Sequence, residues 1–298
     1  MKVGSYRSWL VRSARTATVV VCLLLLGATA YSQESRNAQQ QTIQFKSELV
    51  GQVLPYDALL PVGYAKSNKR YPVLYLLHGL FGRHDDWLTR TNLAAYAAQY
   101  ELIIITPEGH DRWYVDSATK PQDKYESYFI QELIADVDTR FRTIKDRRAR
   151  GIAGLSMGGY GALKFGVKHR NYFVFAGSLS GALDAAKRTA DHPGFAWDIL
   201  RPSIVESFGP AGSPTRAGND LHELARNATD ISALPYLYLD CGLEDGFLRT
   251  NAEFAEILVA KKIPHQYRQL PGKHSWEYWD RQVQEILRLY AELTARAH

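Results

Sequence analysis

Apolar runs that alternate with amphipathic helical patterns constrain the fold of this chain more than any other feature of its sequence. The run from Val73 to Leu77 is apolar at every position, as in a strand that is buried on both faces of a sheet. Tyr128–Phe141 and Ser275–Ala297 instead repeat their apolar residues at helical spacing. Strands that alternate with helices form mostly parallel sheets covered on both faces, so the sequence predicts an α/β fold.

Eight short segments have the apolar or alternating pattern of strands. They are Thr42–Ser47, Gln52–Leu60, Tyr71–His78, Leu102–Pro107, Arg150–Gly154, Phe173–Ser178, Tyr236–Asp240 and Gln266–Leu270. Residues 181–232 separate two of these strands and are rich in proline and glycine. Because connections of this length usually form lids or binding loops, we expect a loop-rich cap insertion at about 181–232 within one domain of residues 42–298.

The first thirty residues have the parts of a secretory signal peptide. Four basic residues and no acidic one accompany the apolar run Ala17–Leu26, and Ala28 and Ala30 form an Ala-x-Ala site. The run is shorter than the roughly 20 residues that a transmembrane helix needs, which favours cleavage near Ala30 over a membrane anchor. We expect residues 31–41, which are polar and rich in glutamine, to be a flexible leader. The predicted location is secreted or periplasmic, with no stable membrane anchor after cleavage.

Charge and cysteine content narrow the class of protein further. The chain has 36 Lys and Arg residues against 31 Asp and Glu, a formal net charge of +5. Because four of the basic residues lie in the first thirty, cleavage leaves 32 basic and 31 acidic residues, and no nucleic-acid partner is predicted. Cys241 then remains as a single thiol, so no intramolecular disulfide is expected.

The glycine-rich segment Gly151–Ala162 carries the most specific chemical signal. Residues 154–158 read Gly-Leu-Ser-Met-Gly, a G-x-S-x-G pattern between a predicted strand and a predicted helix. A sharp turn there leaves no room for side chains on either side of the serine and lifts its hydroxyl above the sheet. Ser156 is therefore the candidate nucleophile, and a serine that only caps a glycine-rich helix is the alternative.

A nucleophilic serine needs an acid and a base, which we expect later in the chain in the order Asp or Glu, then His. His274 follows the last predicted strand and opens the final helix, at the edge of the sheet where such sites assemble. Three carboxylates compete for the role of the acid: Asp240, Glu244 and Asp245. We favour Asp245, with Asp240 organising the loop and Glu244 in solvent.

Two backbone N–H groups are candidates for stabilising an oxyanion. One belongs to Met157 at the start of the predicted helix, and the other belongs to Leu80 in the glycine-containing loop His78–Gly82, with Phe81 as the alternative to Leu80. Four aromatic residues beside these loops are candidates both for pocket walls that bind substrate and for the core: Trp113, Tyr114, Phe247 and Trp276.

Taken together, these motifs resemble the esterase D family of α/β-hydrolases. The resemblance rests on seven segments spread over roughly residues 45–290: Leu76–Gly82, Trp87–Asn92, Trp113–Ser117, Ala153–Leu163, Ser178–Gly181, Cys241–Asp245 and Gly272–Trp276. This family includes S-formylglutathione hydrolases, tributyrin-type esterases, feruloyl and acetyl-xylan esterases and mycolyltransferases, and Gly79–Trp87 is most similar to the tributyrin type. The resemblance implies an α/β-hydrolase fold with Ser156, Asp245 and His274 as the catalytic triad, and with Leu80 and Met157 as oxyanion donors.

The function that the resemblance implies is that of a secreted serine carboxylesterase. Its expected substrates are small-molecule or polysaccharide-linked esters with short acyl groups, acetyl and feruloyl among them. An acyltransferase of the mycolyltransferase type and a non-catalytic binding protein on a hydrolase scaffold are the alternatives. No metal or organic cofactor is expected, because His84–Asp86 and His222–Glu223 lack both metal-site spacing and a third ligand. Nothing in the sequence predicts an oligomeric state.

Overall fold

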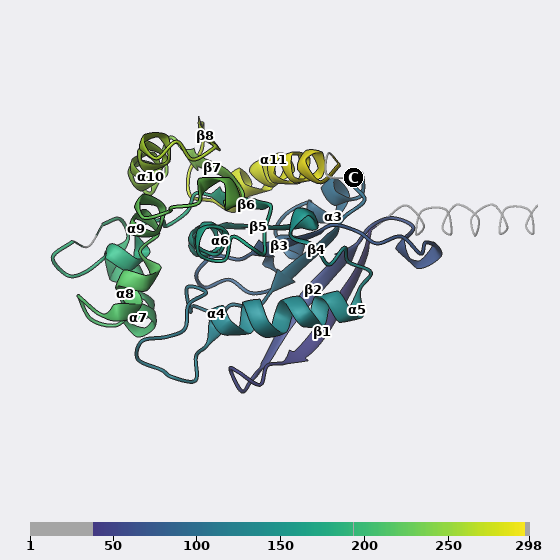
Figure 1. Ribbon diagram of the computed structural model, residues 1–298, viewed down its shortest axis with the longest axis horizontal. Coiled ribbons are helices and arrows are strands. Elements are labelled where there is room, and N and C mark those ends of the chain that lie inside the picture. The colour runs from purple at the N-terminus through teal and green to yellow at the C-terminus, as the bar shows by residue number, and fades with distance from the viewer. Residues whose placement is uncertain (1–37, 193, 296–298) are drawn as a thin grey trace, which may run out of the picture. The chain divides into compact units, whose positions relative to one another are not determined.

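The computed structural model describes residues 38–192 and 194–295 (Figure 1). The predicted signal peptide and residues 31–37 of the expected leader lie outside the described residues and stay predictions. Strand β1 (Gln39–Lys46) starts inside the expected leader, so the expectation of flexibility was wrong for Gln39–Gln41. The reason is pairing: these three residues lie opposite Leu60, Leu59 and Ala58 in an antiparallel ladder.

Eight strands form one mostly parallel sheet, in the order β1-β2-β4-β3-β5-β6-β7-β8. Strands β1 and β2 run antiparallel at one edge, and β4, β3 and β5 to β8 pair in parallel. After β1, the strands are β2 (Val53–Leu60), β3 (Val73–Leu77), β4 (Ile103–Pro107), β5 (Arg150–Leu155), β6 (Phe175–Leu179), β7 (Tyr236–Gly242) and β8 (His265–Leu270). The predicted α/β class is confirmed, and each predicted strand segment overlaps an observed strand.

Helices lie on both sides of the sheet (Figure 1). The longer ones are α5 (Ile134–Arg140), α6 (Met157–Lys168), α7 (Trp197–Phe208), α10 (Leu248–Ala260) and α11 (Trp276–Ala295). The shorter α-helices are α2 (Asp86–Thr89), α3 (Leu93–Ala97), α4 (Tyr125–Ser127), α8 (Pro214–Asn219) and α9 (Leu221–Arg226). A π-helix, η2 (Tyr128–Leu133), precedes α5, and 3-10 turns are η1 (Tyr64–Lys66), η3 (Arg147–Ala149), η4 (Ala185–Lys187) and η5 (Ile231–Ala233). None of the described helices is long and apolar enough to span a membrane.

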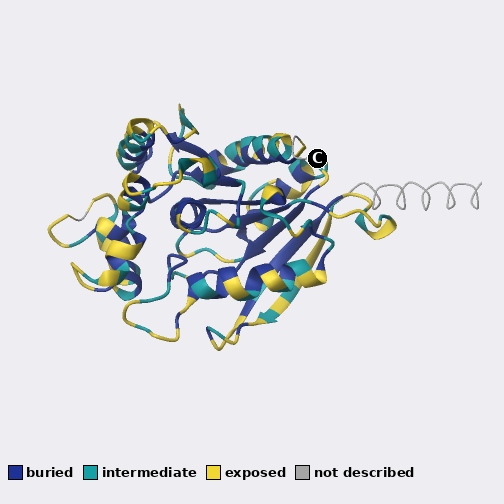
Figure 2. Cartoon of the chain, in the orientation of Figure 1, coloured by how far each residue is buried: buried dark blue, intermediate teal, exposed yellow. Residues whose placement is uncertain are grey.

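The central strand β3 shows how the two layers of the core form. All five of its residues are buried, as its uninterrupted apolar run predicts (Figure 2). Val73, Tyr75 and Leu77 face a cluster that includes residues of η2, α5, α6 and α10. Leu74 and Leu76 face the opposite cluster, which includes Trp87 and residues of α3 and α11. The sheet is therefore fixed between two helical layers, and its strand ends hold the loops of the site.

The cap insertion (residues 181–232) was expected to be rich in loops, but it holds η4, α7, α8, α9 and η5. Local capping explains two of these helices. The Ser213 side chain accepts the Arg216 N–H at the start of α8, where Pro214 occupies a first-turn position. The Asp220 side chain accepts two N–H groups at the start of α9. Prolines and glycines of the insertion lie both at helix ends and within helices, as Pro202 does in α7 and Gly218 in α8, instead of marking one long loop.

Candidate active site

The turn between β5 and α6 carries Ser156 in a strained conformation. The φ of Ser156 is +53° and its ψ is −115°, a backbone conformation that residues other than glycine rarely adopt. The flanking glycines allow the turn, because a Cβ on Gly154 would lie 2.6 Å from the Gly158 carbonyl oxygen. A Cβ on Gly158 would lie 2.5 Å from the His78 carbonyl oxygen. Both glycines of the G-x-S-x-G pattern are therefore required because another backbone segment lies too close to leave room for a side chain.

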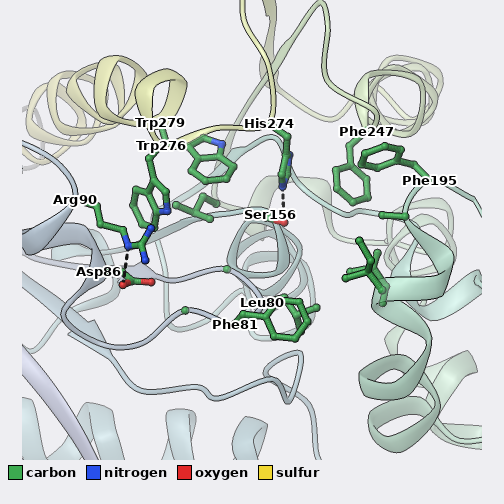
Figure 3. Close-up of a pocket in the computed structure, with 16 residues that line it drawn as sticks. Leu80, Phe81, Asp86, Arg90, Ser156, Phe195, Phe247, His274, Trp276 and Trp279 are labelled. Atoms are coloured by element: carbon green, nitrogen blue, oxygen red, sulfur yellow. Dashed lines mark hydrogen bonds and ion pairs between the residues drawn. The ribbon is translucent and has the colours of Figure 1, made fainter.

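His274 connects Ser156 to Asp245, although 118 residues separate the serine from the histidine. His274 Nε2 lies 3.0 Å from Ser156 Oγ (Figure 3). On the other side of the ring, His274 Nδ1 lies 2.9 Å from Asp245 Oδ2. The second carboxylate oxygen of Asp245 accepts the Phe247 N–H at 2.9 Å, which holds the carboxylate towards the ring. With Nδ1–H donating to Asp245, Nε2 is free to accept the serine hydroxyl proton.

The two other carboxylates of this region point elsewhere. Asp240 is fully buried and accepts hydrogen bonds from the hydroxyls of Tyr238 at 2.8 Å and Tyr278 at 3.0 Å. Burial raises the pKa of Asp240 to about 7, against the effect of the two tyrosine hydroxyls. Glu244 lies on the surface, 3.6 Å from the ammonium group of Lys273. Of the three candidates, Asp245 alone contacts His274.

The two predicted oxyanion donors, the backbone N–H groups of Leu80 and Met157, differ from the N–H of Phe81 in their hydrogen bonding. The N–H of Met157 opens helix α6 and therefore has no intrahelical acceptor. The N–H of Leu80 is assigned no acceptor within residues 38–192 and 194–295. The N–H of Phe81, the alternative, donates to Asp111 Oδ1 at 2.6 Å and is not free. Leu80 and Met157, and not Phe81, therefore remain the candidate oxyanion donors.

The loop of Leu80 is held in place by Gly109, Tyr114 and Glu108, a role that sequence reasoning assigned to none of the three. The Gly109 N–H donates to His78 Nε2 at 2.9 Å, and the Tyr114 hydroxyl donates to the His78 carbonyl oxygen at 3.0 Å. Glu108 is buried and accepts the backbone N–H groups of His84 and His110. Glu108 directly follows strand β4, and that position at a strand end was the one signal that could have identified it.

The site opens into a cavity of about 480 Å³. Its lining residues are Gly79, Leu80, Phe81, Gly82, Asp86, Arg90, Leu155, Ser156, Phe195, Ala196, Ile199, Leu200, Phe247, His274, Trp276 and Trp279. Two of the four aromatic residues proposed as pocket walls, Phe247 and Trp276, are among them (Figure 3). No sequence pattern pointed to the four cap residues 195, 196, 199 and 200.

Trp113 and Tyr114 do not reach the cavity, so their assignment to the pocket walls was wrong. Both are almost completely buried, at 0% and 1% exposure. Trp113 packs edge-on against Tyr160, and its Nε1–H donates to Ser203 Oγ at 3.0 Å. The Tyr114 carbonyl oxygen accepts a hydrogen bond from the buried ammonium group of Lys164. These long-range contacts place both rings in the core beneath the site.

Other reactive or metal-binding groups do not compete with this site in the part of the chain that the structure describes. No group of three or more His, Cys, Asp or Glu side chains that could hold a metal ion occurs among residues 38–192 and 194–295. The thiol of Cys241 is buried, and burial raises its pKa well above the ordinary value. His222, of the pair His222–Glu223, is buried in the cap insertion and lies edge-on to Phe254.

A family model described as "Putative esterase" matches residues 47–290, most of the chain. The chain belongs to this esterase family. The predicted resemblance, the α/β-hydrolase fold and the class of enzyme are thereby confirmed: this esterase acts on carboxylic ester bonds.

Relatives of this esterase have several acyl substrates in their names. The acetyl esterase of Caldicellulosiruptor saccharolyticus is 28% identical over 262 residues, which cover 81% of this chain and 94% of the relative. The diacylglycerol acyltransferase/mycolyltransferase Ag85B of Mycobacterium leprae is 26% identical over 314 residues, with 94% and 93% coverage. A solved ferulic acid esterase superimposes with a TM-score of 0.71 at 26% identity, with 86% and 99% coverage.

Proposed function

We propose that this esterase hydrolyses carboxylic esters through a covalent acyl-enzyme on Ser156. The observation that carries the proposal is the continuous hydrogen-bond chain from Ser156 through His274 to Asp245, whose serine and histidine line one cavity together with Leu80. Because Asp245 accepts from Nδ1 of His274, the other ring nitrogen is oriented towards the serine. This arrangement also speaks against a non-catalytic binding protein.

The first half of the reaction forms the acyl-enzyme. His274 Nε2 removes the Ser156 hydroxyl proton while Oγ attacks the ester carbonyl carbon, and Asp245 stabilises the imidazolium that results. The N–H groups of Leu80 and Met157 stabilise the tetrahedral oxyanion. Loss of one such donor typically costs about 3–4 kcal/mol of transition-state stabilisation. The C–O bond to the alcohol then breaks, and the alcohol leaves with the proton held by His274.

The second half regenerates the serine. Water loses a proton to His274 and adds to the acyl carbonyl carbon, and the same two N–H groups stabilise the second oxyanion. The bond to Ser156 Oγ breaks as His274 returns the proton to it, and the carboxylic acid leaves. In acyl transfer, the hydroxyl of a second alcohol takes the place of water. The match to the mycolyltransferase makes this the second candidate activity.

The natural substrates proposed are small-molecule or polysaccharide-linked esters outside the cytosol. The acetyl esterase and ferulic acid esterase relatives support acetyl and feruloyl groups as acyl candidates. Secretion is proposed from the basic, apolar and small-residue order of residues 1–30.

The nucleophile is tested with p-nitrophenyl acetate on the unmodified protein, Ser156→Ala and Ser232→Ala. Ser232 is exposed and does not line the cavity, so its substitution controls for the loss of a serine. We expect Ser156→Ala to lose at least about 10³-fold in kcat and Ser232→Ala to keep its rate. A fluorophosphonate probe should add its mass to the peptide that contains Ser156. Equal turnover by Ser156→Ala, or labelling at another residue, would refute the proposal.

A further inference from the structure

The cavity around Ser156 has two chemically different halves. On one side, Arg90 pairs with Asp86 at 3.2 Å, and its guanidinium lies over the Trp276 ring (Figure 3). On the other side, five residues supply apolar side chains and no charge: Phe195, Ala196, Ile199, Leu200 and Phe247. An ester of an apolar acid with a polar alcohol has the same asymmetry.

Large apolar side chains are exposed at the mouth of this cavity. Phe81 is 71% exposed, Ile199 is 60% exposed and Phe195 is 48% exposed, and all three line the cavity. Single exposed apolar residues are ordinary on protein surfaces, but a group of them around one pocket indicates a binding surface. We call these three residues the apolar rim.

The backbone on both sides of the mouth is held in an unfavourable conformation. Phe81 has a φ of +61°, and Ala196, next to Phe195, has a φ of +57°. Both values lie in the left-handed region, which residues with a Cβ rarely occupy. The hydrogen bond from the Phe81 N–H to Asp111 helps to hold the first of these conformations. Strain of this kind persists where the surrounding structure enforces it, and it is concentrated at ligand-binding sites.

The cap side of the rim packs directly onto the loop of Asp245. The Phe195 ring meets the Phe247 ring edge-on, with centroids 5.1 Å apart. Gly246 makes room for it, because a Cβ there would lie 2.3 Å from the Phe195 ring. Phe247 in turn lies 5.0 Å from the His274 ring. An apolar surface therefore runs without interruption from His274 to the rim.

We infer that the apolar rim binds the acyl group of the substrate and selects for extended apolar acyl groups, alkyl or aryl, over acetyl. The inference rests on the proposed function, since it requires the ester carbonyl at Ser156. An acetyl group ends next to the carbonyl and leaves the rim uncovered. A longer group removes the rim from water, and each methylene buried in this way favours binding about fourfold. The Asp86–Arg90 side then faces the polar alcohol.

The test compares p-nitrophenyl octanoate with p-nitrophenyl acetate, each below its aggregation limit. The measured quantity is the ratio of kcat/KM for the two esters in the full chain, Ile199→Ser, Phe81→Asn and Val205→Ser. Asparagine tolerates the left-handed conformation that position 81 requires. Val205 lies on the same helix, α7, and is 42% exposed but does not line the cavity, so Val205→Ser is the matched control.

We expect the unmodified protein to prefer octanoate. Ile199→Ser and Phe81→Asn should each lower the ratio about 15-fold, the equivalent of two buried methylenes. Val205→Ser should keep the original ratio. A ratio that both rim variants leave unchanged would overturn the inference. A second series keeps the acetyl group and lengthens the alcohol. If Ile199→Ser lowers kcat/KM for the longer alkyl acetates instead, the rim binds the alcohol and the inference is overturned. If no ester is turned over at all, the proposed function itself fails.

Discussion

Substitution of Gly158 by alanine tests the close packing of the serine turn against the loop of Leu80. A Cβ at position 158 would lie 2.5 Å from the His78 carbonyl oxygen and 2.6 Å from the Leu77 carbonyl oxygen. Real Cβ atoms essentially never approach within 3.0 Å of another atom, and ordinary contact begins at 3.4 Å. The backbone of one segment must therefore move by roughly 0.5–0.9 Å, because neither obstacle is a flexible side chain.

This displacement falls between the two proposed oxyanion donors. His78 precedes Leu80 by two residues, and Gly158 directly follows Met157, so a shift at the contact changes the separation of their N–H groups. A misplacement of about 1 Å in an active site can cost roughly 100-fold in rate. For Gly158→Ala we expect kcat to fall roughly 10–100-fold, about 1.4–2.7 kcal/mol, and the free energy of unfolding to fall by about 1–3 kcal/mol.

The assay is p-nitrophenyl acetate hydrolysis together with a thermal melt, and Gly218→Ala is the control. Gly218 lies in helix α8, where an added Cβ would meet nothing within 4 Å. Alanine there should leave the rate unchanged and raise the free energy of unfolding by about 0.5–1 kcal/mol, because it restricts the unfolded chain. A Gly158→Ala protein with normal kcat and normal melting temperature would show that the tight contact does not set the geometry of the donors.

Two further substitutions separate the neighbouring carboxylates. Asp245→Asn should reduce kcat by roughly 10³–10⁴-fold, because the imidazole of His274 loses the carboxylate that orients and stabilises it. Substitution of the exposed Glu244 by glutamine should change kcat by less than about twofold. Similar rates for the two variants would exclude Asp245 as the acid. Because the pKa of Asp240 is raised to about 7 in the folded protein, the unfolded chain loses this proton near pH 4 while the folded protein keeps it up to about pH 7. The free energy of unfolding should therefore fall by on the order of 1 kcal/mol per pH unit between about pH 4 and 7. Chemical denaturation across this range should show a smaller decline for Asp240→Asn, and parallel curves would contradict the buried-acid interpretation.

Local patterns predicted the elements of this fold well. The continuous apolar run of β3 and the helical spacing of α11 are properties of short segments, and the structure contains both within two residues of the predicted bounds. Local interactions also explain why the cap insertion contains helices although its prolines and glycines suggested loops. Side-chain caps such as Ser213 and Asp220 stabilise short helices that periodicity cannot detect over six residues.

Aromatic positions show where sequence patterns lose their predictive value. Trp113 and Phe247 both follow strands and both looked like pocket residues, but only Phe247 lines the cavity. Trp113 packs against Tyr160 and Phe208, from distant helices, and is completely buried. The exposure of a side chain depends on which distant segments cover it, and the residues next to it in the sequence do not reveal which segments those are.

The amino-acid sequence by itself determined the strand–turn–helix that presents Ser156, because glycine spacing encodes a close backbone approach within a few residues. It also narrowed the partners of the serine to His274 and three carboxylates. Tertiary structure decided that Asp245 lies against His274. It also decided that the Phe81 N–H donates to Asp111, while the Leu80 N–H has no assigned acceptor within the described residues. It also decided the composition of the apolar rim. These outcomes depend on distances of a few ångströms between segments that only the packing of the whole sheet and its helices brings together.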